Sequence, residues 1–68
     1  MNDFINISTS ELAHLIDEWI FSERDRAILK RRLIDGIHHE SLAEEFNLSV
    51  RQIKTIVYNG TNILRNKH

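Results

Sequence analysis

The scarcity of chain-breaking residues limits what this sequence can fold into more than any other feature. Its 68 residues include no proline and only two glycines. Proline and glycine are the strongest local interruptions of regular structure, so their scarcity favours long helices joined by short corners. We therefore expect an all-α protein, a small bundle of about four helices.

Apolar residues with helical spacing define the first helix. One stripe with i, i+3, i+4, i+7, i+8 spacing consists of Leu12, Leu15, Ile16, Trp19 and Ile20. Ser8 stands three residues before Glu11, the spacing of a cap at a helix start. The pattern predicts a helix from about residue 9 to residue 20.

Three further helices are expected after it. Ser22 and Asp25 repeat the cap spacing, and the helix that follows should stop at Gly36, because glycine adopts the left-handed conformation at little cost. A short helix is predicted over 39–46, burying Leu42, Ala43 and Phe46. A longer helix should then run to about residue 65.

The stretch "EEFNLSVRQIK", residues 44–54, is predicted to form a tight corner between the last two helices. Asn47 can accept left-handed dihedral angles, Leu48 is expected to plug the core, and Ser49 is a good N-cap. Ala43 is small where the two helices would cross. A short helix, a break of three or four residues and a second helix form the outline of a helix-turn-helix, whose second helix lies in the major groove of DNA.

The last helix has two chemically different sides. At about 100° per residue its apolar side covers an arc of roughly 120° and consists of Ile53, Ile56, Val57, Gly60, Ile63 and Leu64. Gly60 either breaks the helix or lets another helix approach closely; because the stripe resumes in phase, we expect a continuous helix. The opposite side, the donor face, has hydrogen-bond donors and no carboxylate: Arg51, Lys54, Thr55, Tyr58, Asn62 and Arg65. Such a face suits entry into the major groove, although it could also be only the solvated side of the helix.

Charge is separated along the chain behind a net value of -1. Residues 1–23 carry five acids and no Lys or Arg, and residues 24–36 carry five bases against two acids. Residues 37–50 hold three acids and no base, whereas residues 51–68 hold four bases and no acid. Since nucleic acid responds to the local field, the basic second and last helices could still face phosphate. The acidic first helix would point away from DNA, as part of the core and as a partner surface.

The stretch from Ser22 to Leu64, "SERDRAILKRRLIDGIHHESLAEEFNLSVRQIKTIVYNGTNIL", resembles region 4 of bacterial RNA polymerase sigma factors. The matching elements are "ERDRAIL", the "R-L-x-D-G" helix end, "ESLAEEFNLSVRQIK" and the apolar spacing that continues to Leu64. LuxR-type helix-turn-helix domains share much of this pattern. At 68 residues the chain is expected to be one domain over 1–68, with an acidic N-terminal helix in 1–21 and a core in 22–66 that is sigma region 4-like by this resemblance.

The resemblance also implies a function in transcription, because the second helix of the motif reads an upstream promoter element in sigma region 4. The matching positions for base edges are Val50, Arg51, Lys54 and Thr55. The residues expected nearer the DNA backbone are His39, Ser49, Gln52 and Tyr58. The chain departs from the family in having Asn47 in place of the usual glycine and nothing similar to sigma region 2.

These observations predict a sequence-specific regulator that binds double-stranded DNA. The chain is less basic than most such domains, so we expect weak affinity and action beside a partner, either RNA polymerase or a second copy. The alternative is a protein-interaction module of the same fold that docks on RNA polymerase or another regulator without contacting DNA.

Other classes of function find less support in the sequence. There is no cysteine to provide thiolates, and the adjacent His38 and His39 would point about 100° apart on a helix, a poor metal pair. No nucleophile turn or glycine-rich phosphate cradle is present, so we expect no enzyme and no cofactor. No apolar run approaches the roughly 18 residues of a membrane span, and we expect a cytoplasmic protein.

Overall fold

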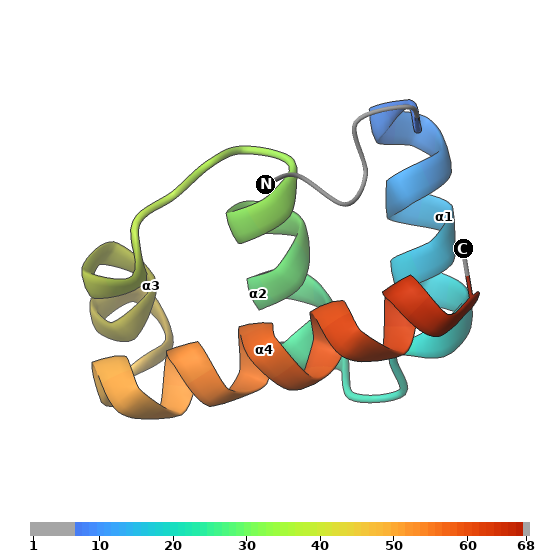
Figure 1. The fold of residues 1–68 in the computed structure, drawn as a ribbon. Helices are drawn as coiled ribbons and strands as arrows, with labels where there is room; N and C mark the ends of the chain where they lie inside the picture. Colours follow the sequence, from blue (N-terminus) through green and yellow to red (C-terminus); the bar gives the residue numbers. More distant parts are fainter. Residues whose placement is uncertain (1–6, 68) are drawn as a thin grey trace.

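The computed structural model describes residues 7–67, which form four helices and no strand (Figure 1). The helices are α1 (Thr9–Trp19), α2 (Glu23–Leu33), α3 (His39–Phe46) and α4 (Val50–Lys67). The predicted all-α bundle of four helices is therefore confirmed. The predicted domain limits at 1 and 68, and Asp3 of the acidic segment, lie outside the described residues.

Serine side chains begin three of the helices, at the positions that the spacing predicts. The Oγ atoms of Ser8, Ser22 and Ser49 accept the backbone N–H of the third residue that follows, at 3.1, 3.3 and 3.1 Å. Each bond satisfies one of the four N–H groups that a helix start leaves without an intrahelical partner. The helix starts are thus determined locally.

A left-handed residue ends α3, and another follows α2. Asn47 has φ 56° and ψ 46°, and the N–H of Leu48 donates to the carbonyl of Ala43 at 2.9 Å, which closes α3. Gly36 has φ 71°, as expected, but α2 itself ends at Leu33. The residues between the end of α2 and Ile37 form a turn. A hydrogen bond from the Ile37 N–H to the Arg31 carbonyl, at 3.1 Å, holds this turn against the helix end.

The longest helix, α4, contacts all three others and runs along one side of the molecule (Figure 1). Its N-terminal half lies against α3 and its C-terminal half against α1, while α2 crosses its middle. α1 and α3 do not contact each other. The corner between α3 and α4 is therefore at the end of the molecule remote from the acidic first helix.

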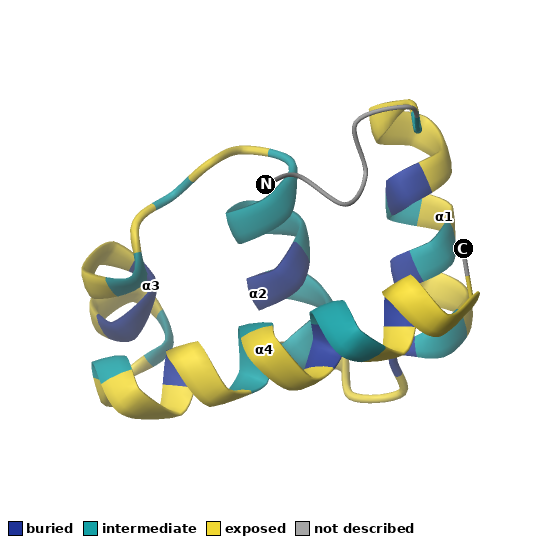
Figure 2. Ribbon diagram, viewed as in Figure 1, coloured by how far each residue is buried: buried dark blue, intermediate teal, exposed yellow. Residues whose placement is uncertain are grey.

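The buried residues form two small clusters, and dark blue marks their positions along the ribbon in Figure 2. The cluster beside α1 consists of Leu12, Ile16, Ile20, Leu29 and Leu64. The cluster beneath the α3–α4 corner consists of Ile28, Leu42, Ala43 and Ile53. α2 supplies adjacent residues, Ile28 and Leu29, to the two clusters, and both are fully buried. α4 likewise supplies Ile53 to one cluster and Leu64 to the other, so α2 and α4 together join the corner to the rest of the molecule.

α4 continues through Gly60, as the in-phase apolar stripe predicts. Gly60 is buried, and a Cβ atom there would come within 2.8 Å of Leu29 Cδ2 and within 3.1 Å of its Cγ. Of the two roles considered for Gly60, close approach of a second helix is the one observed.

Several residues of the predicted apolar stripes are less buried than expected, and Leu15, Ile56 and Val57 are among those that are half-buried. Ile63, expected on the apolar side of α4, is 41% exposed, because the α1–α2 connection leaves that flank of the helix open. Phe46 and Trp19 are half-buried and pack at the margins of the two clusters. No helix in the part of the chain that the structure describes is both long and apolar enough to cross a membrane.

Candidate nucleic-acid interface

The start of α4 is held by a reciprocal pair of bonds between Ser49 and Gln52. The Gln52 N–H donates to Ser49 Oγ at 3.1 Å, and the Ser49 N–H donates to Gln52 Oε1 at 2.9 Å. Leu48, directly before it, is half-buried and packs on the cluster beneath the corner. The first turn of α4 is therefore fixed both by its caps and by a side chain anchored in the core.

Most of the donor face of α4 is open to solvent. Arg51, Lys54, Thr55 and Tyr58 are all exposed, and Tyr58 keeps 68% of its surface accessible. Within residues 7–67, neither Arg51 nor Lys54 forms an ion pair. Two cations with unoccupied donors therefore stand on the first two turns of the helix that follows the corner, where a helix in the major groove makes its base contacts.

Two of the four predicted base-contacting residues have part of their side chain occupied. Val50 is half-buried and packs against the cluster beneath the corner, so only part of it can contact DNA. The Thr55 hydroxyl donates to the Arg51 carbonyl at 3.0 Å, which leaves its oxygen to accept and its methyl group to make apolar contact. Arg51 and Lys54 are thus the members of the set with free donors.

The residues predicted nearer the DNA backbone have different surroundings. Ser49 and Gln52 cap α4, and because Gln52 uses only its Oε1 atom, its amide N–H groups can still donate to phosphate. His39, the first residue of α3, is half-buried. Burial lowers the pKa of His39, and the positive charges of Arg32 and Lys54 lower it further. His39 is therefore neutral at pH 7 and close to the cation of the donor face.

The five bases of α2 all bind groups within the protein, unlike those at the start of α4. Three form ion pairs: Arg24 with Asp25 at 3.1 Å, Lys30 with Asp17 at 2.7 Å, and Arg31 with Glu45 at 2.9 Å. The hydrogen bond from Lys30 lowers the pKa of Asp17. The other two, Arg26 and Arg32, donate to the carbonyls of Ile20 and Ile37 at 2.8 and 3.2 Å. Both basic helices were expected to be able to face phosphate. Of the two, α4 is the one whose first two turns carry cations with side-chain donors that bind no group within residues 7–67.

The sequence pattern did not indicate the ion pair between Arg31 and Glu45. It joins residues 14 positions apart and ties α3 to α2. Periodicity along one helix carries no information about such a contact between helices.

Arg24 is a further residue near the interface that the sequence pattern did not indicate. It lines a hollow of about 320 Å³ together with Leu48, Arg51, Gln52, Thr55 and Ile56. The first turn of α2 therefore approaches the first turns of α4 and adds a third cation beside the donor face. The contact depends on how α2 crosses α4, so the spacing along α4 alone could not have revealed it.

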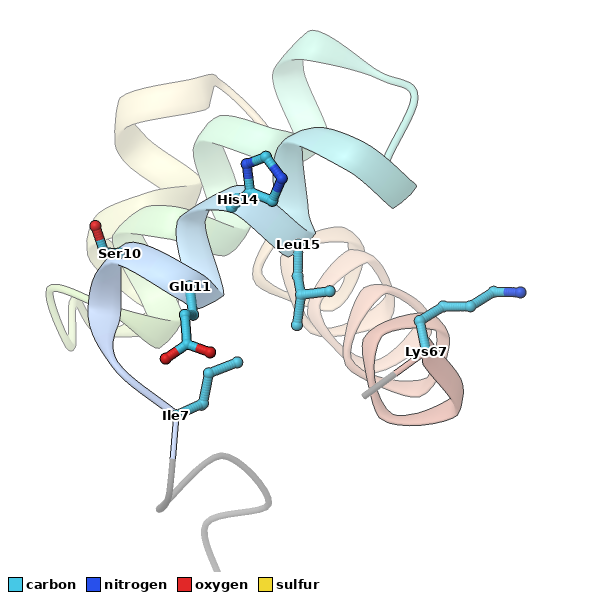
Figure 3. Close-up of a pocket in the computed structure, with 6 residues that line it drawn as sticks. All are labelled: Ile7, Ser10, Glu11, His14, Leu15 and Lys67. Carbon is cyan, nitrogen blue, oxygen red and sulfur yellow. The ribbon is translucent and has the colours of Figure 1, made fainter.

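A second hollow, of about 550 Å³, lies between the start of α1 and the end of α4. In Figure 3, Ile7, Glu11 and Leu15 lie below α1, whereas His14 lies on its upper side. Lys67 extends from the end of α4 away from the others. The polar groups of this hollow diverge instead of meeting at one point. No group of three His, Asp or Glu side chains in residues 7–67 is placed to hold a metal ion.

Comparisons with known proteins do not identify a relative of this chain. No family model, curated protein or solved structure matches the chain. We therefore infer function from the residues of this chain.

Proposed function

We propose that this protein is a cytoplasmic transcription regulator that binds double-stranded DNA by placing α4 in the major groove. It would act as a domain related to sigma region 4 that lacks the rest of a sigma factor. The observation that supports the proposal is the donor face at the start of α4: exposed cations and no carboxylate, on a helix whose first turn is capped and anchored.

In this proposal the side chains on α4 divide by the groups they can reach. Arg51 and Lys54 have free donors and suit the O6 and N7 acceptors of guanine, while Thr55 and Val50 suit apolar contact with a thymine methyl group. Tyr58, one turn further along, and the amide of Gln52 are available to phosphate oxygens. His39 and Ser49 lie at the edge of this surface, at the starts of α3 and α4.

The same geometry supports low intrinsic affinity. Each phosphate contact contributes about 0.9 to the slope of log K against log salt, and the few unpaired bases here allow only a modest total. Arg24, Lys30 and Arg31 already have carboxylate partners. We therefore propose that stable action on DNA requires a partner, either RNA polymerase or a second copy of the chain.

The proposal is tested by fluorescence anisotropy with a pool of random DNA duplexes at several salt concentrations. We expect salt-dependent binding by the wild type and loss of binding by a variant with Arg51→Ala and Lys54→Ala. Absence of salt-dependent binding by the wild type would overturn the proposal.

Two lysine substitutions test whether the position of a charge matters for DNA binding, because each removes one positive charge from a different helix. Lys54→Ala should weaken binding by roughly tenfold, as expected for loss of one specific contact of about 1.4 kcal/mol. Lys30→Ala removes the same charge from α2, where Lys30 is paired with Asp17, and should change binding much less. Equal effects of the two substitutions would show that only the overall charge matters, which contradicts a defined donor face.

The competing hypothesis is a protein-interaction module of the same fold. It is favoured by the acidic α1, which carries exposed Glu11, Asp17 and Glu18 and no base. This hypothesis predicts co-purification with RNA polymerase that survives Arg51→Ala and Lys54→Ala, with no duplex binding by the wild type.

A further inference from the structure

Two large apolar side chains are exposed together beside the C-terminal half of α4. Phe21, in the connection between α1 and α2, keeps 88% of its surface accessible, and Ile63 keeps 41%. Both line a hollow of about 500 Å³. We name it the apolar hollow; its other lining residues are Trp19, Ile20, Ser22, Asp25, Leu29, Ile56, Asn59, Gly60 and Lys67.

The apolar hollow faces away from the proposed DNA contacts. At about 100° per residue, the α4 residues that line it and the exposed donors Arg51, Lys54, Thr55 and Tyr58 have mean directions roughly 140° apart around the helix. The hollow presents an exposed Phe and an Ile, and Lys67 is the one cation among its lining residues. A bound duplex would therefore leave this surface uncovered.

The two ends of the apolar hollow carry a carboxylate and an ammonium group. The carboxylate, Asp25, is already paired with Arg24 through its Oδ1 atom at 3.1 Å, so its Oδ2 atom is the one that remains for a further cation. α4 extends about 16 Å from Ile56 to Lys67, at 1.5 Å per residue. Lys67 marks one end, with its Nζ 4.5 Å from the centre of the Trp19 ring. Asp25 belongs to the Ile56 end, because its neighbour Arg24 lines the adjoining hollow with Ile56 and Arg51.

We propose that the apolar hollow binds a second copy of this chain in a two-fold symmetric dimer. A two-fold axis across the middle of the hollow places the two α4 helices antiparallel and brings Asp25 of each copy to Lys67 of the other. Phe21 projects beside the hollow that it lines, so each copy offers one projecting ring and one apolar recess. Each copy therefore carries both the projecting ring and the recess that receives it, with opposite charges at the two ends of the hollow. Such a surface is self-complementary, as an isologous interface requires.

The expected dimer is weak. A standard interface takes about 800 Å² from each partner. That area is about a sixth of this chain's accessible surface of 4761 Å². We expect an interface no larger than this and a dissociation constant that is micromolar or weaker. The donor faces of the two copies then lie outside the interface.

Sedimentation equilibrium of the full chain over a wide concentration range tests the proposal without DNA. We expect reversible dimerisation of the wild type and at least a tenfold weaker association after Phe21→Ser. Tyr58→Ser is the matched control, since it removes another exposed aromatic ring from α4 on the donor face and should leave association unchanged. Far-UV circular dichroism checks that each variant keeps its helices. A wild type that remains monomeric at about millimolar concentration, or equal effects of the two substitutions, overturns the proposal.

A charge exchange tests the orientation of the two copies. Asp25→Lys and Lys67→Asp should each weaken dimerisation by roughly tenfold, and the double variant should restore it because the two charges are reversed together. Failure of the double variant to recover association overturns the antiparallel arrangement. If Phe21→Ser abolishes co-purification with RNA polymerase while the wild type is monomeric, the surface binds polymerase and the second-copy proposal is wrong. Duplex binding by a monomeric wild type would leave the proposed function intact, so the two proposals can fail separately.

Discussion

Substitution of Gly60 by alanine separates the intrinsic preference of α4 for helix from its packing against α2. Alanine is more favourable than glycine in a helix interior by about 1 kcal/mol, so the local effect is stabilising. The added Cβ, however, would lie within 2.8 Å of Leu29 Cδ2 and 3.1 Å of Leu29 Cγ. Leu29 is fully buried, so moving it displaces other core atoms.

The packing effect should exceed the local one. Extra methyl groups in a well-packed core cost about 1–3 kcal/mol. With a mid-range cost of about 2 kcal/mol against a gain of about 1 kcal/mol, Gly60→Ala should lower the free energy of unfolding by about 1 kcal/mol. In a domain of this size that corresponds to a fall in Tm of roughly 4–8 °C.

Thermal and urea unfolding followed by circular dichroism measures this difference. Asn59→Ala, at the adjacent exposed position of α4, is the control and should be neutral or slightly stabilising because it changes only helix propensity. Shortening Leu29 in the Gly60→Ala background should cost less than shortening it in the wild type, because the new methyl group fills part of the space. If Gly60→Ala instead raises stability by about 1 kcal/mol, the close approach of α2 and α4 is refuted.

Three further predictions concern the elements that hold the corner. Ser49→Ala removes the cap of α4 and should cost about 1 kcal/mol in urea unfolding, whereas Ser41→Ala, inside α3, should cost much less; equal costs would contradict the capping role. Glu45→Gln should cost about 0.2–1 kcal/mol at low salt and little at high salt, because it removes an exposed ion pair with Arg31, while Glu44→Gln serves as its neutral neighbour. Because the folded-state pKa of His39 lies below its usual 6.5, the fold favours neutral His39 and loses stability as the pH falls below 6.5; His39→Gln should lessen that loss, which urea unfolding at several pH values measures. If phosphate contacts His39, it raises this pKa, so duplex affinity should rise as the pH falls below 7 and should do so less in His39→Gln.

Much of the fold follows from local rules that are visible in the sequence. Ser8, Ser22 and Ser49 cap helices at the predicted positions, and Asn47 takes a left-handed conformation directly after α3. Gly36 is left-handed as well, although α2 ends three residues before it, at Leu33. These outcomes depend on residues within a few positions of one another. Local hydrogen bonds and dihedral preferences are therefore sufficient to predict them.

The same is true of the outward side of α4. Helical periodicity alone separates Ile53 and Leu64, which are buried, from Arg51 and Lys54, which are exposed. The prediction that these donors contact DNA stays a prediction, because exposure and charge on one face are also compatible with a solvated surface.

Contacts between helices were decided only by the tertiary structure. The crossing of α2 over α4 places Leu29 against Gly60, brings Arg24 beside Arg51, and leaves Phe21 and Ile63 exposed together. The packing of α2 against α1 and α3 pairs Lys30 with Asp17 and Arg31 with Glu45, so that charge counted along the chain overstates the field available to DNA.

The physical reason for this division is the range of the interactions. The sequence by itself determined the helices, their starts and the apolar side of each, because caps, dihedral preferences and a repeat of 3.6 residues act over one or two turns. The tertiary structure decided which flank of α4 stays open and which charges stay unpaired, because side chains distant in sequence compete for the same neighbours only after the helices have packed.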